Sequence, residues 1–341
     1  MERNAIYFPY IEVPRNSWFY RVLLYWNNVS TIIPLEYHNK SKIGPFMYEL
    51  IEKKLIRPIY PDEMIKKIPK FDEEFINYIS SEEYLKEKRL SINKKLKTRD
   101  LHFDKIESIK DKLIELDLAK KISSPWYEVE QFTAVRYMAY LASKIGNLPD
   151  VNSRPTTDDI KYLNGYASDS FLNGKIRSDI ETTRGFLLKE LFPSPVGNIS
   201  PRDIIEFKDE NNYELMKCQN KIESFLIDYI STDSEFRKEK YNQFIHDYNE
   251  EKDNIIKLMN KHGWEKINFG DFVTYFGLGG GFGASIARSD PAGAITSLSG
   301  IVGKSYSDYK KINNFENEKK QIIKNSYTAY AVLYEKEYLN I

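Results

Sequence analysis

The sequence predicts a helix-dominated α+β fold. A small N-terminal α/β unit precedes a helix and a β-hairpin, and a mainly α-helical C-terminal domain follows. Short runs of β-branched and aromatic residues alternate with helical patterns near the N-terminus, and long amphipathic patterns fill the C-terminal half. The 341 residues, 41% of them hydrophobic, suffice for two domains. We divide the chain into an α/β unit with a wing-like hairpin, a mixed connecting segment and a helical domain: residues 1–148, 149–199 and 200–341.

The N-terminal residues predict a strand–helix–strand–helix–strand unit with parallel pairing. The predicted strands are AIYFPYI, STIIPLE and LIRPIYP, at residues 5–11, 30–36 and 55–61. Asn16 or Ser17 is expected to cap the first helix, which carries Trp18, Val22, Leu23, Trp26 and Val29 at helical spacing. The second helix passes through Phe46, Leu50 and Leu55.

The middle of the chain predicts charged helices followed by a hairpin. Residues 61–97 are helical in pattern, and residues 104–117 place Ile106, Ile109, Leu113 and Ile114 on one side of a further helix. LAKKISSPWYEVE, residues 118–130, predicts a β-hairpin across Ser123, Ser124 and Pro125. An amphipathic helix that stops at Gly146 comes next. PDVNSRPTTDD, residues 149–159, has the composition of a linker, although Thr156–Asp159 also suits a helix cap.

The C-terminal half predicts a long helical hairpin. Ser200 is expected to be the N-cap of its first helix, with Pro201 at the first helical position and Asp203 in the first turn. That helix should run to about residue 230 with a break near Asn211, and the next should end near Gly263. A last helix is expected over residues 313–339.

Charge and cysteine content bear on compartment and partners. Fifty basic residues balance fifty acidic ones, so no net field attracts nucleic acid, and self-association meets little repulsion. The one cysteine, Cys218, fits a reducing compartment. The first residues lack the features of a signal peptide, and no window holds eighteen uninterrupted apolar residues. We therefore expect a cytoplasmic protein without a constitutive membrane span.

A glycine-rich stretch covers residues 276–305. A phosphate-binding loop is disfavoured because Leu298 stands where the Walker pattern needs its first glycine, and a dinucleotide fingerprint because Phe282 stands where its third glycine belongs. The small residues recur at close helical spacing, which predicts two helices in close contact through Gly279, Gly283, Ala287, Gly293, Ser297 and Gly300. The alternative is a membrane-inserting hairpin over residues 272–303.

Few residues have the spacing of a catalytic or metal site. The four histidines are scattered and distant in sequence from Cys218, so the sequence predicts no metal site and no cofactor. His102 and Asp104 in LHFD are the candidate catalytic pair, because on a strand they would share a face. Cys218 lies in an amphipathic helix and is expected to be packed rather than reactive.

A basic run is the candidate interaction surface. It consists of Lys86, Lys88, Arg89, Lys94, Lys95, Lys97 and Arg99. Such a run can follow a phosphate backbone, and the helix and hairpin after it resemble a winged-helix module. Neighbouring acidic clusters offset its field, so a solvated helix face explains the run equally well and nucleic acid is not the favoured partner.

Several stretches together are similar to the landmarks of a bacterial family. In order they are AIYFPYIEVPRNSWFYRVLLYWNNVSTIIP, LHFDKI, LAKKISSPWYEVE, RYMAYLA and RPTTDD, between residues 5 and 159. This order resembles an uncharacterised bacterial family, domain of unknown function 6236. The resemblance implies a bacterial, cytosolic protein, and a role in conflict with phage. It implies no activity, cofactor or catalytic residue.

Three hypotheses of function follow. The leading one is a non-enzymatic interaction or scaffold protein that acts through a protein partner or as a homo-oligomer, in bacterial anti-phage defence. The first alternative is an enzyme of unrecognised class that uses His102 and Asp104. The second is a membrane-active effector that inserts the hairpin of residues 272–303.

Overall fold

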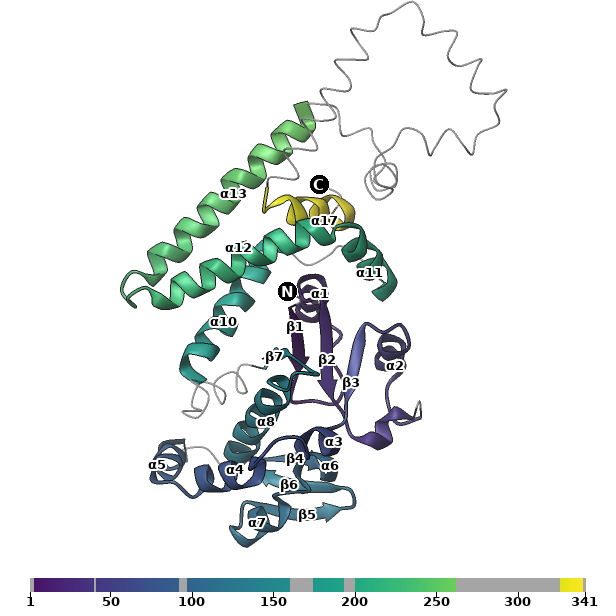
Figure 1. The fold of residues 1–341 in the computed structure, drawn as a ribbon, viewed down its shortest axis with the longest axis vertical. Helices are drawn as coiled ribbons and strands as arrows, with labels where there is room; N and C mark the ends of the chain where they lie inside the picture. Colours follow the sequence, from purple (N-terminus) through teal and green to yellow (C-terminus); the bar gives the residue numbers. More distant parts are fainter. Residues whose placement is uncertain are drawn as a thin grey trace, which may run out of the picture. The chain divides into compact units, whose positions relative to one another are not determined.

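The computed structural model describes residues 3–39, 41–91, 97–159, 174–192, 200–261 and 326–339. It is a helix-dominated α+β structure, as predicted (Figure 1). The chain separates into two units, of which the first comprises residues 1–194 with 200–205 and the second the remainder.

A parallel sheet forms the N-terminal part of the first unit. Its order is β3-β2-β1-β7, and the strands are Asn4–Tyr7 (β1), Asn28–Ile32 (β2), Ile56–Ile59 (β3) and Ser153–Thr156 (β7). Helices Ser17–Tyr25 (α1) and Pro45–Glu52 (α2) connect the first three strands, and the short helix Leu35–His38 (η1) follows β2. The Phe19 N–H donates to Asn16 Oδ1 at 3.1 Å, so Asn16 is the cap of α1. The predicted strand–helix alternation and its parallel pairing are confirmed.

The predicted linker is wrong, because Ser153–Thr156 is the edge strand β7. It pairs in parallel with β1 from Asn4↔Ser153 to Tyr7↔Thr156. Proline lacks a backbone donor and is confined to sheet edges or bulges. Pro58 in β3 and Pro155 in β7 lie on the two edge strands of this sheet. The polar, proline-containing composition of residues 149–159 predicts a linker, but in the structure it belongs to a segment that contains an edge strand.

A second, antiparallel sheet has the order β4-β6-β5. The strands are Thr98–His102 (β4), Ala119–Ser123 (β5) and Trp126–Glu130 (β6), so the predicted hairpin is confirmed. The single helix expected over residues 104–117 is wrong. Two short helices, Phe103–Ile106 (α6) and Lys110–Glu115 (α7), occupy this segment, and Ile114 is exposed rather than on the buried side.

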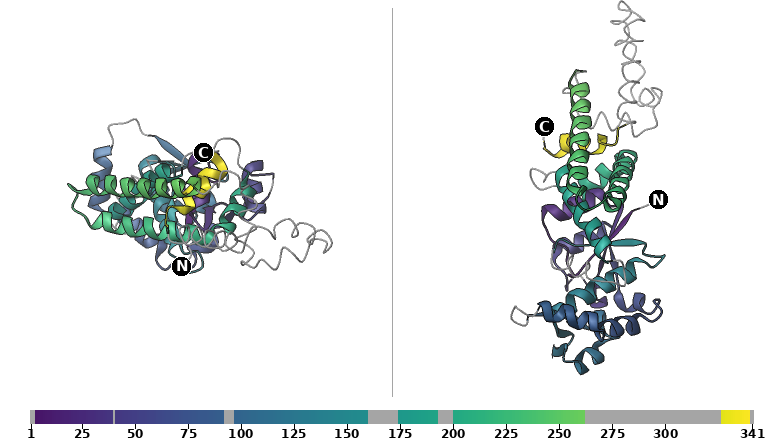
Figure 2. Two further views of the ribbon diagram at one scale, coloured as in Figure 1. Left: turned by 90° about the horizontal axis from the view of Figure 1, so that it is seen from above. Right: turned by 90° about the vertical axis from the view of Figure 1, so that its left-hand side faces the viewer.

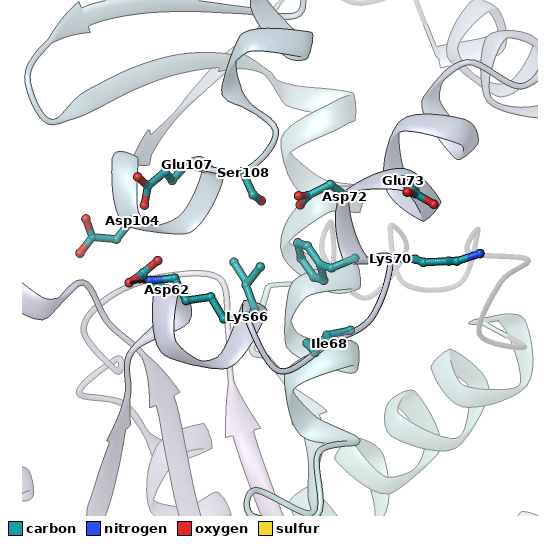
Figure 3. A pocket seen from close by; sticks show the side chains of 11 residues that line it. Asp62, Lys66, Ile68, Lys70, Asp72, Glu73, Asp104, Glu107 and Ser108 are labelled. Atoms are coloured by element: carbon teal, nitrogen blue, oxygen red, sulfur yellow. Dashed lines mark hydrogen bonds and ion pairs between the residues drawn. The ribbon is translucent and has the colours of Figure 1, made fainter.

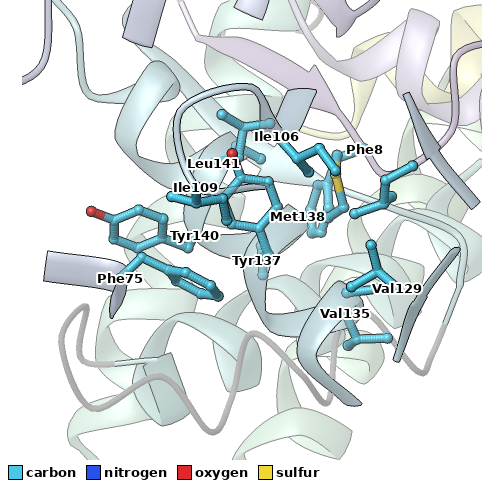
Figure 4. Close-up of a cluster of buried hydrophobic side chains, with 14 of the residues drawn as sticks. Phe8, Phe75, Ile106, Ile109, Val129, Val135, Tyr137, Met138, Tyr140 and Leu141 are labelled. Carbon is cyan, nitrogen blue, oxygen red and sulfur yellow. The ribbon is translucent and has the colours of Figure 1, made fainter. Parts of the chain in front are cut away.

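The core of the first unit surrounds helix α8, Gln131–Gly146. Around it lie the helices Pro61–Ile65 (α3), Phe71–Ile79 (α4) and Glu82–Ser91 (α5). The rings of Phe75, Tyr137 and Tyr140 lie close together, with the Phe75–Tyr137 centroids 4.9 Å apart (Figure 4). Aromatic contacts of this kind bury large areas, which gives the charged helices a common apolar side.

The remaining described helices are long. They are Gly174–Leu191 (α10), Pro201–Glu210 (α11), Asn212–Ser231 (α12), Arg237–Lys261 (α13) and Ala329–Leu339 (α17). Ser200 and Asp203 form a reciprocal cap, with N–O distances of 3.0 and 3.2 Å, and α11 and α12 are separated at Asn211, as predicted. Helices α12 and α13 lie side by side (Figures 1 and 2). Phe225 stacks on Phe244 with ring centroids 4.2 Å apart.

Within the described ranges, no helix combines the length and the apolar character needed to cross a bilayer. The glycine-rich residues, including Gly279, Gly283, Ala287, Gly293, Ser297 and Gly300, lie outside the described ranges, as do residues 313–325 of the predicted last helix.

Candidate functional site

The polar residues of the first unit that are candidates for a functional site lie at the carboxyl edge of the parallel sheet. In open parallel sheets, ligands bind outside this edge, at the point where the strand order reverses. Here the chain moves from β1 outward to β2 and β3, and later adds β7 on the other side of β1. The reversal therefore lies between β1 and β7, and the segments that follow these strands form the expected binding edge.

His102 joins the two sheets of the first unit. It ends β4, is buried, and places Nε2 3.0 Å from Glu36 Oε1 in η1. The Asp104 backbone N–H donates to His102 Nδ1 at 3.2 Å. Since Nδ1 accepts a hydrogen bond, the hydrogen of the ring is on Nε2, and Nε2–H donates a hydrogen bond to Glu36. That bond lowers the pKa of the Glu36 carboxyl. Both ring nitrogens are therefore engaged, which makes His102 a positioning residue rather than a free base.

Asp104 lies beside His102, but not as a neighbour on the same strand face. The strand ends at His102 and α6 begins at Phe103, so the chain turns between the two residues. Asp104 Oδ1 lies 3.5 Å from His102 Nδ1, and Oδ2 accepts the Leu35 N–H at 3.0 Å. The sequence-predicted pair is thus brought together, and both side chains fasten the β4–α6 junction to the segment after β2.

Lys105 is the third tether of this junction. Its side chain is buried, and Nζ donates to the Pro9 carbonyl oxygen, after β1, at 3.0 Å. Among the described residues, no carboxylate lies within ion-pair distance of this nitrogen. Burial lowers the pKa of Lys105 to about 7, because removal from water disfavours the charged form. The Tyr137 hydroxyl donates to the Lys105 carbonyl oxygen and holds the backbone of α6 in place.

A cavity of about 480 Å³, which we call the Lys105 cavity, opens at this edge. Its lining consists of Pro9, Tyr10, Ile11, Asp100, Leu101, His102, Lys105, Ile122, Ser123 and Trp126. Leu101, His102 and Lys105 are buried and form the inner part of the lining. Tyr10, Asp100 and Ile122 are exposed and form its rim. The volume falls within the range of about 300–1,000 Å³ that is usual for small-molecule sites.

Tyrosine–aspartate pairs occupy the strand-order reversal beside the cavity. Tyr10 Oη donates to Asp159 Oδ2 at 2.9 Å, and Tyr7 Oη donates to Asp158 Oδ1 at 3.4 Å. Asn16 Nδ2 also donates to Asp158, at 3.2 Å. Burial, with the adjacent carboxylates, raises the pKa of both phenols. Both therefore remain protonated hydrogen-bond donors at neutral pH.

A second cavity, of about 660 Å³, lies between α3, α4 and α6. Its lining carries five carboxylates and two lysines: Asp62, Asp72, Glu73, Asp104, Glu107, Lys66 and Lys70. Asp62 lies on α3, Asp72 and Glu73 lie on α4, and the other two acids lie on or directly after α6. Lys66 pairs with Asp62 at 2.8 Å (Figure 3). Across the described part of the chain, no group of three or more His, Cys, Asp or Glu side chains is placed to hold a metal ion. We assign this cavity no ligand.

The basic run is divided between different elements. Lys86, Lys88 and Arg89 lie on α5, Lys97 directly precedes β4 and Arg99 lies on it, and Lys94 and Lys95 fall outside the described residues. Lys88 is 3.4 Å from Glu130. The structure therefore does not bring the described members of the run onto one element, and one of them already faces an acid.

Cys218 is buried in α12, and burial raises the pKa of its thiol to about 12. A thiolate is the reactive form of cysteine, so this residue is a packed thiol, as predicted.

Sequence reasoning found His102 and Asp104 but missed Lys105, Glu36 and Tyr10. In sequence, Lys105 is one polar residue beside Ile106, and the amphipathic pattern predicts that it is solvated. The available signal is indirect: Tyr10 and Glu36 each lie at the carboxyl end of a predicted strand, and residues at that position of a parallel sheet gather at one edge. Lys105 itself carries no such signal, because it reaches the edge from α6, which follows a strand of the other sheet.

Comparisons with protein-family models, with curated proteins and with solved structures gave no match to this chain.

Proposed function

We propose that the first unit is the small-molecule site of an enzyme, in which the Lys105 amine acts on a ligand held in the Lys105 cavity. The observation that carries the proposal is a buried lysine that lines a ligand-sized cavity and whose amine has no carboxylate partner among the described residues. This is the enzyme alternative, with Lys105 in the chemical role and with His102 and Asp104 in positioning roles.

The amine is difficult to explain as a structural feature. A buried ammonium normally has an anionic partner, because an unpaired charge in an apolar environment costs several kcal/mol. Lys105 instead has one neutral acceptor, the Pro9 carbonyl, among the described residues. With a pKa of about 7, a large share of the amine is neutral at physiological pH. A neutral amine is a nucleophile and a general base, and desolvation is one way in which enzymes produce it.

The surroundings hold this amine in a fixed place. The tethers Glu36–His102, Leu35–Asp104 and Pro9–Lys105 connect the β4–α6 junction to the segments after β1 and β2. Rigid elements position reactive groups more accurately than free loops. Asp100 at the rim adds a carboxylate that can interact with a bound molecule, whereas the Tyr10 hydroxyl donates its hydrogen to Asp159 and offers its oxygen as an acceptor.

Competitive labelling with fluorodinitrobenzene at about pH 7.4 tests the proposal. Roughly 70% of an amine with a pKa near 7 is neutral at that pH, against roughly 0.1% of an ordinary lysine. We expect the peptide that contains Lys105 to be labelled at least ~tenfold faster than the peptide that contains Lys120. Lys120 is the matched control, since it lies on β5 of the adjoining sheet, is exposed, and pairs with Glu128 at 2.5 Å.

Equal labelling of Lys105 and Lys120 would show that Lys105 is an ordinary or inaccessible amine, and the enzyme proposal would then fail. Lys105→Met, verified as folded by circular dichroism, should remove the fast-labelling peptide and leave the rate at Lys120 unchanged.

Self-association is the second candidate function. It corresponds to the hypothesis that the chain is a non-enzymatic interaction protein that forms a homo-oligomer. Three exposed apolar side chains, Tyr213, Met216 and Ile227, recur at intervals of three and eleven residues along α12. These intervals place them on one side of the helix. The occupant that we infer for this stripe is a second copy of the chain, because its net charge of zero offers no repulsion to an identical molecule.

A further inference from the structure

The cavity that contains Lys105 combines a nucleophilic amine with an apolar lining and an acidic rim, and we infer that its substrate is an uncharged aldehyde or ketone that forms an imine with Lys105. This inference rests on the proposed function. It adds the class of substrate and the covalent step to the general statement that the amine acts on a bound ligand.

The lining favours a compact molecule with an apolar or aromatic body. Trp126 stands edge-on to the His102 ring, with centroids 5.3 Å apart, and Ile11, Leu101 and Ile122 supply aliphatic surface. An apolar wall excludes water from the amine, and this favours the dehydration that completes an imine. A strongly hydrated substrate would make no apolar contacts with this surface.

The charges argue against an anionic substrate. Asp100 lines the same cavity as Lys105, and Asp158 and Asp159 stand beside the neighbouring Tyr7 and Tyr10. A carboxylate or phosphate ligand would be repelled by Asp100 within the lining itself. A neutral carbonyl compound meets no such repulsion, and its reaction needs the uncharged lysine that burial favours.

The covalent step balances without another reactant. The Nζ lone pair forms a bond to the carbonyl carbon, the C=O π pair moves to oxygen, and the proton lost by nitrogen protonates that oxygen to give a carbinolamine. The C–O bond then breaks, the oxygen leaves as water after taking one more proton from nitrogen, and the nitrogen lone pair closes the C=N bond. Asp100 at the rim is the carboxylate of the lining that can carry these protons.

Two probes that differ mainly in charge test the inference: methyl para-formylbenzoate and para-formylbenzoate. The full chain is incubated with each probe and with sodium cyanoborohydride, whose hydride converts an imine to a stable secondary amine. Peptide mass mapping then locates the adduct. We expect ~tenfold more ester adduct on Lys105 than on Lys120, since Lys105 is the largely neutral amine of these two. We also expect less adduct on Lys105 from the carboxylate than from the ester.

Each outcome separates this inference from the proposed function. Fast fluorodinitrobenzene labelling of Lys105 without any imine adduct would overturn the carbonyl class and leave the reactive amine intact. Failure of both reactions would overturn both proposals. A preference for para-formylbenzoate would overturn the uncharged class and identify an anion site. Lys105→Met and Lys105→Arg serve as controls, because each removes the neutral amine and the arginine keeps the positive charge.

Discussion

Lys105 connects the charge state of one residue to the stability of the native unit. Its pKa is about 7 in the folded chain against an ordinary value of 10.5, and burial is the cause. Between these pH values the unfolded chain binds more protons at this position than the native chain does. Stability therefore rises with pH across the window, and below about pH 7 the full cost of burying the ammonium remains. The cost corresponds to at most about 5 kcal/mol, because one pKa unit is 1.36 kcal/mol.

The Lys105→Met variant should lose this pH dependence. We expect it to be more stable than the natural chain at about pH 6.5, and the difference should shrink by several kcal/mol towards about pH 9.5. Urea unfolding of both chains at a series of pH values measures this, and subtraction removes the titration of all other groups. Parallel stability profiles for the two chains would show that Lys105 is solvated and ordinary.

At the scale of elements, Gly146 determines how closely α8 approaches β7. A Cβ atom at this position would lie 2.3 Å from the carbonyl oxygen of Ser153 and 3.5 Å from Ile6 Cγ2. The first contact is with backbone, so a side chain cannot be accommodated by a rotamer change. The glycine that predicts the end of a helix in sequence is therefore also a packing position against the edge strand.

Gly146→Ala should destabilise the chain by about 2 kcal/mol or more, because overpacking forces the strand or the helix to move. Gly185→Ala is the matched control: Gly185 lies in α10, and a Cβ there meets nothing within 4 Å. That change should stabilise the chain by about 0.5–1 kcal/mol through helix propensity. Thermal or urea unfolding compares the two variants, and equal effects would contradict the predicted contact between α8 and β7.

The elements that sequence predicts well are those with a local signal. The strand–helix alternation, the hairpin, α8 and the Ser200 cap each follow from short patterns. Strand β7 does not, because SRPT is polar, contains a proline, and pairs with residues that precede it by about 150 positions. The sequence predicts a single helix where α6 and α7 lie, because the helical spacing of the apolar residues continues through the break at residues 107–109.

The same reason explains the partial prediction of the site. His102 and Asp104 form a contact within three residues of sequence, so a motif suggests them. Lys105 becomes distinctive only through burial and through a carbonyl oxygen of a distant segment, and neither is visible in a local pattern. The chemistry at this edge arises where two sheets meet, and a pattern within one segment cannot reveal it.

At the scale of the whole molecule, the α12 stripe predicts self-association. Ile227→Asp should weaken it by ~tenfold or more, since a charge would be buried in an apolar contact. Asn249→Asp on α13 is the control, because that position is exposed and receives the same charge. Light scattering over a concentration series measures the molar mass. A monomer at every concentration, or equal weakening by both variants, would exclude the stripe as the contact between copies.

The hydrogen bond from Lys105 to Pro9 joins residues 96 positions apart, so the unusual amine exists only in the assembled unit. In an unfolded chain the same lysine is solvated and protonated at neutral pH. Unfolding normally accelerates the labelling of a buried side chain by exposing it. At Lys105 the opposite should hold: partial unfolding, as at the urea midpoint, should slow the arylation of this residue. The rate at which Lys105 is arylated would then report the fraction of molecules in which the first unit is folded.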